Sequence, residues 1–327
     1  MSNAHTSALS AAGVSIWLDD LSRERIESGS LQQLLRESDV VGVTTNPTIF
    51  QAAIGGGVGY GDRIADCARR GLDAEQTVFE LTCADVSDAC DAFDEVYAST
   101  GGRDGRVSIE VSPHLANDVS GTVRQAEELW SRIGRPGVMI KIPATEAGVQ
   151  AIAEVIAKGI SVNVTLVFGL TRYREVVNAY LTGLERARLA GHDLGRIHSV
   201  ASVFVSRFDA MIDPQLGAAD ATGGEESAAL RGSAGLANAR LVYEIHRQSL
   251  VSERARLLLA AGANPQRPLW ASTGTKDPAL PDTHYVSGLV LPGTVNTLPA
   301  ATLAAFADHG DVPDHAYTEE DLAALFR

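Results

Sequence analysis

The sequence of 327 residues predicts an α/β fold, a (β/α)8 TIM barrel with additional helices. Two observations predict it. Segments with the two-residue periodicity of β-strands alternate with amphipathic helical segments, and polar residues able to do chemistry stand near the C-terminal ends of the strands. A barrel of this kind takes ~250 residues, so one domain with insertions, residues 1–327, accounts for the whole length.

The strand segments share one design, an aliphatic face opposite a small or polar face. In the fourth segment, Val138, Ile140 and Ile142 alternate with Met139 and Lys141. Such alternation places the aliphatic side chains under outer helices and the others toward the barrel axis. The pattern recurs in five segments, residues 14–19, 41–46, 107–111, 138–142 and 161–166. Three further strands are predicted at residues 197–204, 268–272 and 286–291.

The same rule assigns Val41 and Val43 to the aliphatic face of the second segment, and Leu166 to that of the fifth. On the opposite faces, polar residues lie close to the C-terminal ends of the strands, where active sites of parallel barrels form. We therefore expect one set of side chains to converge on a single mouth of the barrel: Asp19, Asn46, Glu110, Lys141, Asn163 and Thr165.

Helical segments fill the intervals between the strands. Their apolar residues recur at three- and four-residue steps, which is the period of an amphipathic helix. The helices are expected at residues 22–36 and 75–98, after a cap at Asn117 or Asp118, after a cap at Thr145, from Thr171 onward, and between Pro299 and Gly310. A helical insertion of two helices is expected at about 225–262, and a short helical tail at about 318–327.

Five glycines crowd into residues 55–61. A glycine-rich loop can cradle a phosphate, but this one follows no strand directly and lacks a Lys-Ser/Thr ending. A flexible connection is the favoured interpretation.

Bulk composition excludes several classes of protein. The formal net charge is −14 and no basic stripe is evident, so a nucleic-acid-binding surface is not expected. Three cysteines, Cys67, Cys83 and Cys90, are too few and too irregularly spaced for a disulfide framework or a zinc site. Residues 1–13 lack the features of a signal peptide, and polar residues interrupt the apolar run 155–170, so no membrane span is expected. A soluble, cytoplasmic protein is the expectation.

Lys141 is one of only three lysines, against 24 arginines, and it stands in the apolar run 137–143. Desolvation disfavours the charged ammonium, and a neutral amine is a nucleophile. Arginine cannot replace it because the guanidinium stays protonated. Taken alone, Lys141 is better explained as a strand-end lysine whose amine reaches solvent. Its place among converging acids and amides favours the nucleophile.

Several ordered motifs resemble the transaldolase family. The resemblance spans about residues 14–306 and is carried by residues 15–22 (SIWLDDLS), 42–48 (GVTTNPT), 107–111 (VSIEV), 139–143 (MIKIP), 160–168 (ISVNVTLVF), 201–207 (ASVFVSR) and 270–276 (WASTGTK). It implies a cofactor-independent and metal-independent transferase that forms a Schiff base. Transaldolases move a dihydroxyacetone unit from sedoheptulose 7-phosphate to glyceraldehyde 3-phosphate, giving erythrose 4-phosphate and fructose 6-phosphate.

The resemblance also implies catalytic roles. Lys141 matches the Schiff-base lysine, and Glu110 matches the acid/base that works through a water, which Thr165 helps to place. Asp19 matches the residue that exchanges the proton of the substrate C4 hydroxyl.

The substrate-binding residues implied by the resemblance lie around these four. Asn46 and Asn163 match hydrogen-bonding partners of the ketose, and Ser202 lies beside the site. Arg207 matches the phosphate-binding arginine, and Ser272 and Lys276 take the place of an arginine that many members have after the seventh strand. The family also implies a further helical segment beyond Arg327 that packs across the barrel.

Three alternatives remain open on the sequence. The first is a simple Schiff-base aldolase, or a transferase for an unusual sugar. The second is a metal-dependent lyase using His114, His198 or His284, although no metal-binding spacing of histidines is evident. The third is a non-catalytic sugar-phosphate-binding barrel. In each case except the lyase the partners are phosphorylated sugars, bound by a monomer or a homodimer.

Overall fold

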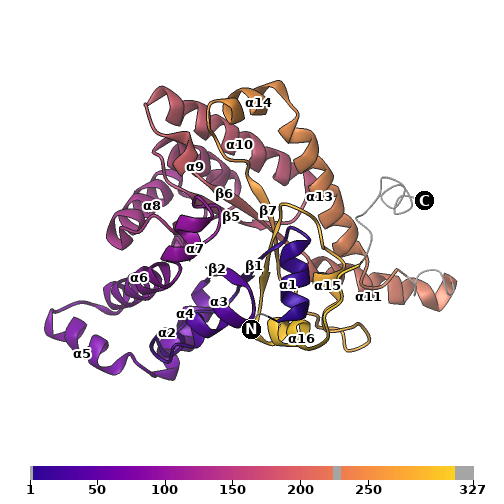
Figure 1. Cartoon of the computed structure of the whole chain (residues 1–327), viewed down its shortest axis with the longest axis horizontal. Coiled ribbons are helices and arrows are strands. Elements are labelled where there is room, and N and C mark those ends of the chain that lie inside the picture. Colours follow the sequence, from indigo (N-terminus) through magenta and orange to yellow (C-terminus); the bar gives the residue numbers. More distant parts are fainter. Residues whose placement is uncertain (1–2, 224–229, 314–327) are drawn as a thin grey trace.

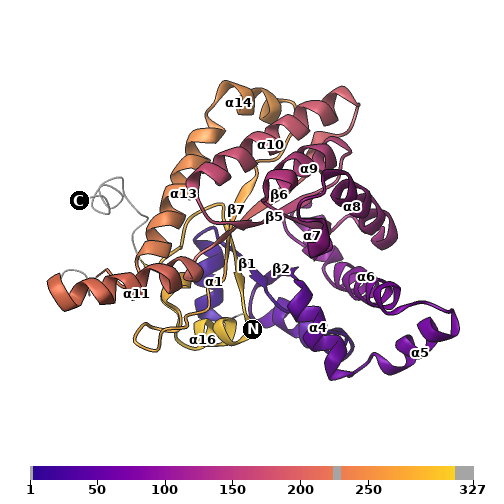
Figure 2. The ribbon, with the colours of Figure 1, turned by 180° about the vertical axis from the view of Figure 1, so that it is seen from behind.

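The computed structural model describes residues 3–223 and 230–313. Eight parallel strands pair in chain order and β8 closes on β1, with helices packed around the outside (Figure 1; Figure 2 from behind). The predicted (β/α)8 barrel with additional helices is confirmed. The strands are β1 (Ser15–Leu18), β2 (Val40–Thr44), β3 (Arg106–Glu110), β4 (Val138–Pro143), β5 (Val162–Val167), β6 (Ser199–Phe204), β7 (Arg267–Ala271) and β8 (Val295–Leu298).

The helices connect successive strands and cover the barrel. In the first half they are α1 (Ala4–Ala11), α2 (Arg23–Glu27), α3 (Ser30–Glu37), α4 (Pro47–Gly56), α5 (Gly61–Arg69), α6 (Ala74–Ala92), α7 (Asp94–Ser99), the 3₁₀ turn η1 (Pro113–Leu115), α8 (Val119–Ile133) and α9 (Glu146–Ala157). In the second half they are α10 (Leu170–Leu189), η2 (Leu194–Arg196), α11 (Ser206–Gly223), α13 (Ala234–Leu250), α14 (Glu253–Ala260), α15 (His284–Ser287) and α16 (Ala300–His309).

Two apolar clusters correspond to the two faces of the strands. The larger joins the outward aliphatic side chains of the strands to the helices. The smaller lies inside the barrel and consists of Trp17, Met139, Val200, Leu269, Ala271 and Val295. The predicted alternation is therefore confirmed for most positions, including Val138, Ile140 and Ile142 outside and Met139 inside. This inner cluster forms a packed floor beneath the C-terminal mouth.

Two positions depart from the predicted alternation, because two strand pairings are irregular. Between β1 and β2 the register shifts after Ile16, and Val41 packs on the inner cluster while Val43 stays outside. Between β5 and β6 the register shifts after Val164, and Leu166 takes a left-handed backbone conformation with φ +57°. Its side chain is exposed at the mouth of the barrel instead of packing under a helix. Irregular pairing of this kind re-aims side chains and is frequent next to active sites.

Two of the predicted helices are divided, and the glycine-rich connection is partly helical. The segment 22–36 forms two helices, α2 and α3, because Gly29 with φ +76° separates them. The segment 75–98 is divided at Phe93 into α6 and α7. The glycine-rich segment contains the end of α4 and a left-handed cap at Gly57. Asp118 and Thr145 cap α8 and α9 through their side chains, as predicted.

The prediction of the eighth strand at residues 286–291 is wrong. Residues 284–287 form α15, and the strand is Val295–Leu298, after the turn at Pro292–Gly293. The apolar residues that suggested a strand, such as Val286 and Leu289, are buried in the outer cluster beside the helices. Their burial explains the apolar run without any strand pairing.

The remaining predictions concern the helices after β6 and the C-terminal tail. The segment expected as an insertion, about 225–262, contains α13 and α14. Residues 225–229 lie outside the described part, as does the tail 318–327.

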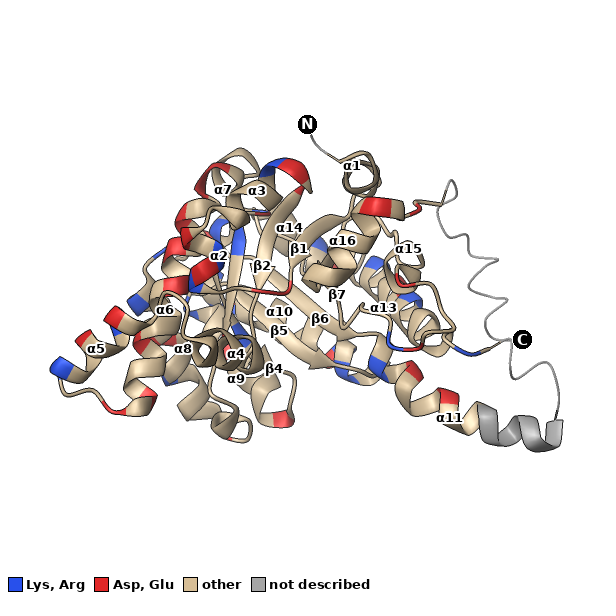
Figure 3. Ribbon diagram, turned by 90° about the horizontal axis from the view of Figure 1, so that it is seen from below, with Lys and Arg blue, Asp and Glu red and all other residues tan. Residues whose placement is uncertain are grey.

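The helices α5 and α11 project from opposite sides of the barrel (Figures 1 and 2). Acidic and basic positions are interspersed along the helices (Figure 3). No helix in the described ranges has the length and apolar character needed to span a membrane.

Replacing Gly42 tests the packing of the barrel interior. A Cβ atom at Gly42 lies 2.7 Å from the Trp17 indole, a buried aromatic ring with no room to retreat. We expect Gly42→Ala to lower the free energy of unfolding by about 1–3 kcal/mol, as overpacking does. At Gly55, by contrast, nothing lies within 4 Å of the added atom, so Gly55→Ala should stabilise by about 0.5–1 kcal/mol. Urea unfolding of the two variants measures this, and a Gly42→Ala protein as stable as the parent contradicts it.

Candidate active site

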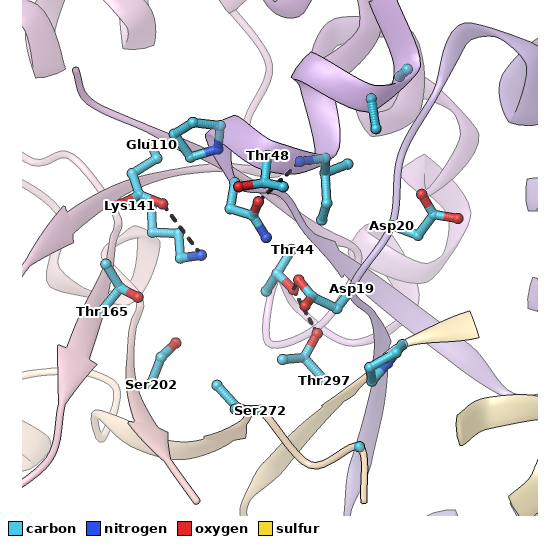
Figure 4. A pocket seen from close by; sticks show the side chains of 18 of the residues that line it. Asp19, Asp20, Thr44, Thr48, Glu110, Lys141, Thr165, Ser202, Ser272 and Thr297 are labelled. Atoms are coloured by element: carbon cyan, nitrogen blue, oxygen red, sulfur yellow. Dashed lines mark hydrogen bonds and ion pairs between the residues drawn. The ribbon is translucent and has the colours of Figure 1, made fainter. Parts of the chain in front are cut away.

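A cavity of about 920 Å³ opens at the C-terminal ends of the strands. Nine of the ten residues predicted from the sequence line it: Asp19, Asn46, Glu110, Lys141, Thr165, Ser202, Arg207, Ser272 and Lys276. Figure 4 shows Asp19, Glu110, Lys141, Thr165, Ser202 and Ser272 around this space. The convergence expected from separate strand ends is therefore present.

Lys141 is held on β4 with its side chain inside the barrel, and the residue is only 6% exposed. Its Nζ donates a hydrogen bond to the Thr45 carbonyl oxygen at 3.0 Å and lies 3.5 Å from Glu110 Oε2 (Figure 4). Glu110 and Lys141 are direct partners in the pairing of β3 with β4, which sets this distance. The amine therefore has a carboxylate beside it and an open cavity in front of it.

Asp19 follows β1 and is held by Thr44, which in turn contacts Thr297; the sequence analysis did not assign either threonine to the site. Thr44 donates from Oγ1 to Asp19 Oδ1 at 2.7 Å, and the Thr44 and Thr297 hydroxyls lie 2.6 Å apart (Figure 4). Thr44 stood on the polar face of its strand, so its position was predictable. Thr297 was not, because it lies on the strand that was misplaced.

Burial changes the acidity of both carboxyl groups. It raises the pKa of Asp19, and the opposing effects of the nearby Lys141 amine and the Thr44 hydroxyl are smaller. It also raises the pKa of Glu110, against the opposing charge and hydrogen bond of Lys141. Two partly buried carboxyls with raised pKa values, facing one cavity, are suited to proton transfer near neutral pH.

Asn163 is the one predicted residue that does not line the cavity. It is fully buried beneath it, where Nδ2 donates to Ser108 Oγ at 3.0 Å and Oδ1 accepts from Ser202 Oγ at 2.7 Å. The three side chains form a hydrogen-bonded row across β3, β5 and β6. Only Ser202 of this row reaches the cavity, so the row fixes the direction of its hydroxyl.

Asn46 and Thr165 flank the reactive groups. Asn46 caps α4, since its Oδ1 accepts from the Ile49 N–H at 3.0 Å, and its Nδ2 has no partner among the described residues. Thr165 is buried on β5, on the side of Lys141 away from Asp19 (Figure 4). Both side chains thus offer polar groups to a bound molecule.

The rim formed by β6 and β7 is cationic. The Arg207 guanidinium stacks over the Phe204 ring, 5.1 Å from its centroid, and Lys276, which follows the neighbouring strand β7, lines the same cavity. Ser272 has a left-handed backbone with φ +56° and its hydroxyl lies 2.9 Å from that of Ser206. A hydroxyl and two cations at one rim suit an anion such as a phosphate group.

The histidines considered as metal ligands lie elsewhere. His198 contacts Asn264 at 3.2 Å and His284 contacts the Gly232 carbonyl at 2.8 Å, and His114 belongs to η1. None of the three lines this cavity. Among the described residues, no group of three or more His, Cys, Asp or Glu side chains is arranged to hold a metal ion.

Comparison with known proteins gives one consistent family. A family model described as Transaldolase/Fructose-6-phosphate aldolase matches residues 16–327. Transaldolase 1 of Streptomyces coelicolor is 58% identical over 325 residues, covering 98% of this chain and 84% of the relative. The transaldolase of Arthrobacter sp. is 57% identical over 313 residues (96% and 84%), and that of Mycolicibacterium smegmatis 54% over 310 residues (95% and 83%).

The raised pKa of Asp19 has a consequence for stability. Because the folded-state pKa lies above the unfolded one, ionised Asp19 destabilises the fold at neutral pH, and this cost disappears as the pH falls toward the unfolded value of about 3.9. We expect Asp19→Asn, which keeps an oxygen for the Thr44 hydroxyl, to melt at a higher temperature than the parent at pH 7.5, with the gain shrinking toward pH 4.5. Thermal melts across this range measure it.

The control is Asp20→Asn, one residue along, which removes a partly exposed ion pair with Arg25 and should give no gain. A parent that is more stable than Asp19→Asn at pH 7.5, or a gain that does not depend on pH, contradicts the prediction.

Proposed function

The chain belongs to the transaldolase/fructose-6-phosphate aldolase family, and from this premise we propose that it transfers a dihydroxyacetone unit between sugar phosphates through a Schiff base on Lys141. The donor and acceptor are sedoheptulose 7-phosphate and glyceraldehyde 3-phosphate. The products are erythrose 4-phosphate and fructose 6-phosphate, as in the pentose phosphate pathway. No cofactor takes part.

One observation supports the proposal above all others. The Lys141 amine is buried in a cavity at the C-terminal mouth of the barrel, between two carboxyl groups whose pKa values burial raises. The neutral form of the amine attacks the ketone carbon C2 of the donor. A partly buried carboxyl group beside it, Glu110 at 3.5 Å, is within reach of the protons that this addition moves.

The imine forms when the carbinolamine loses water. Glu110 in its protonated form supplies the proton for the departing oxygen, and its carboxylate takes a proton back when the imine is hydrolysed. We assign these transfers to a water between Glu110 and the substrate, held by the Thr165 hydroxyl from β5. Burial, which favours the protonated carboxyl, makes Glu110 a usable acid near neutral pH.

Carbon–carbon cleavage requires a base for the C4 hydroxyl, and Asp19 takes this role. As Asp19 removes the proton, the C3–C4 bond breaks, the aldehyde leaves, and the electron pair from the bond passes into the protonated imine to give an enamine. C3 of the enamine then attacks the acceptor aldehyde, whose oxygen receives the proton from Asp19. The raised pKa of Asp19 makes its carboxylate a stronger base than an exposed aspartate.

Substrate positioning is divided between the floor and the rim of the cavity. Asn46 donates from its free amide to substrate hydroxyls, and Ser202, oriented by Asn163, contributes a hydroxyl from β6. At the rim, Arg207, Lys276 and Ser272 bind the phosphate and so hold the reacting carbons against Lys141.

The second candidate is a simple aldolase, which the family description also names. The aldolase releases free dihydroxyacetone, whereas the transferase retains the enamine until an acceptor arrives. The transaldolase names of the relatives favour the transferase. Product analysis of fructose 6-phosphate with and without erythrose 4-phosphate separates the two. We place the activity in the cytoplasm, in a monomer or a homodimer.

Chemical trapping tests the Schiff base. Borohydride added with fructose 6-phosphate should reduce the imine and leave the three-carbon unit on Lys141, located by peptide mass spectrometry. Lys158, which is exposed and paired with Glu127, and Lys276 at the rim are internal controls that should stay unmodified. An adduct on either control lysine, or an active Lys141→Arg variant, removes the assignment.

Removal of Arg207 tests the phosphate rim. Since a charge-assisted hydrogen bond contributes about 1.5–3 kcal/mol, Arg207→Gln should lower kcat/KM for fructose 6-phosphate by tenfold or more and affect unphosphorylated fructose little. Arg188→Gln, at an exposed arginine on α10, is the matched control and should leave both values unchanged. Equal losses with the two sugars show that Arg207 does not bind the phosphate.

A further inference from the structure

A second cavity, of about 380 Å³, lies at the opposite end of the barrel. Its lining residues stand at the N-terminal ends of the strands, where the loops enter them. His198 directly precedes β6, Arg267 begins β7, and Gly293 stands shortly before β8. Met139 and Val200 of the inner apolar cluster line it as well. This end of the barrel is remote from the chemistry proposed above.

The lining is positively charged, in contrast to the protein as a whole. It contains three arginines, Arg103, Arg247 and Arg267, and no aspartate or glutamate. Arg267 is paired with Asp104 at 3.0 Å, and Arg247 lies 3.4 Å from Glu244.

Arg103 has no carboxylate within ion-pairing distance in the described ranges. Burial lowers the pKa of the Arg267 guanidinium, its partner Asp104 opposes this, and the charge of Arg103 adds a smaller lowering effect. Nearby arginines also lower the pKa of His198, after burial, to about 3. In a chain with a formal net charge of −14, this cavity therefore concentrates positive potential.

One wall of the cavity comes from α13, which packs beside β7 (Figures 1 and 2). Tyr243 and His246 stand on this wall with their rings 6.1 Å apart, and Pro265 and Pro292 face the same space. The apolar surface of these residues suits the body of a small organic molecule.

His246 supplies a second, independent indication of a ligand. The residue is 93% buried, because its relative exposure is 7%, and burial lowers the pKa of its ring to about 4, so the imidazole is neutral. None of the described residues forms a hydrogen bond with either ring nitrogen. A buried polar group without a protein partner, lining a cavity, calls for a partner inside that cavity.

We propose that this N-terminal cavity is a binding site for a small organic anion with an apolar body. Its anionic oxygens bind the guanidinium groups of Arg103 and Arg247, and its body packs between Tyr243, Pro265 and Pro292. The free N–H of His246 donates the remaining hydrogen bond. The volume is within the range of small-molecule sites, at about 300–1,000 Å³.

Calorimetric titration with phenyl phosphate tests the proposal. The starting protein is the full chain carrying Arg207→Gln and Lys276→Gln, so that binding at the proposed phosphate rim does not contribute. We expect saturable binding of one equivalent, with a shift of the His246 ring signals in ¹H–¹⁵N spectra. Benzyl alcohol, which has a similar body without the charge, should bind at least tenfold more weakly.

Adding Arg103→Gln and Arg247→Gln should weaken phenyl phosphate binding tenfold or more, because each substitution removes a charge-assisted hydrogen bond to the phosphate. Adding Arg188→Gln and Arg256→Gln instead removes the same charge from exposed arginines elsewhere and should change the Kd little. In an otherwise unchanged chain, Arg103→Gln with Arg247→Gln should retain turnover, which shows that it folds.

Two results overturn the proposal. The first is the absence of saturable binding in the starting protein. The second is a Kd that the Arg103 and Arg247 substitutions leave unaltered.

Discussion

The structure depends on keeping one amine inside a closed barrel. Lys141 points inward from a central position of β4, so its Nζ must find polar partners within the barrel or remain unpaired. Thr45 and Glu110 supply them at 3.0 and 3.5 Å. An ion pair buried in this way offsets a large desolvation cost only in part, and it is weak evidence for a stabilising role. Its value lies in placing a reactive nitrogen where water is limited and a carboxyl is close.

The rest of the barrel supports that position from below and from the sides. The apolar floor around Trp17 and Met139 separates the catalytic mouth from the cationic cavity at the other end. Above the floor, the row of Ser108, Asn163 and Ser202 connects β3, β5 and β6. At the mouth, the left-handed residue Leu166 shows that regular strand geometry ends where the cavity begins. Such departures recur at functional sites, where surrounding packing holds them in place.

Sequence periodicity predicted the parts of the fold in which strand pairing is regular. Lys141 and Glu110 were both assigned correctly to the inner face because a two-residue period holds throughout β3 and β4, and the strand pairing then makes them direct neighbours. Val41 and Leu166 were misassigned because an irregular pairing adds a residue to one strand without leaving a mark in the apolar pattern. The four residues of β8 were missed because a longer apolar run nearby, buried beside helices, resembled a strand more closely.

The same limits apply to the site. Residue types and strand ends were sufficient to find five of the nine predicted residues that line the cavity, while Ser202, Arg207, Ser272 and Lys276 came from the family resemblance. The depth of Asn163 required the three-dimensional packing. Thr297, which completes the support of Asp19, depended on the misplaced strand. The carbonyl of Thr45 carries no signal in the sequence at all, since every residue has a carbonyl, and only the fold selects the one that meets Lys141.

Oxygen exchange at the donor ketone tests the central claim most directly. Forming an imine at C2 expels the ketone oxygen as water, and hydrolysis of the imine restores an oxygen from solvent. Fructose 6-phosphate labelled with ¹⁸O at C2 should therefore lose its label at a rate set by the enzyme, far above the spontaneous rate, and Lys141→Arg should abolish the excess. Turnover to products with the label still on C2 of the transferred unit contradicts an imine on Lys141.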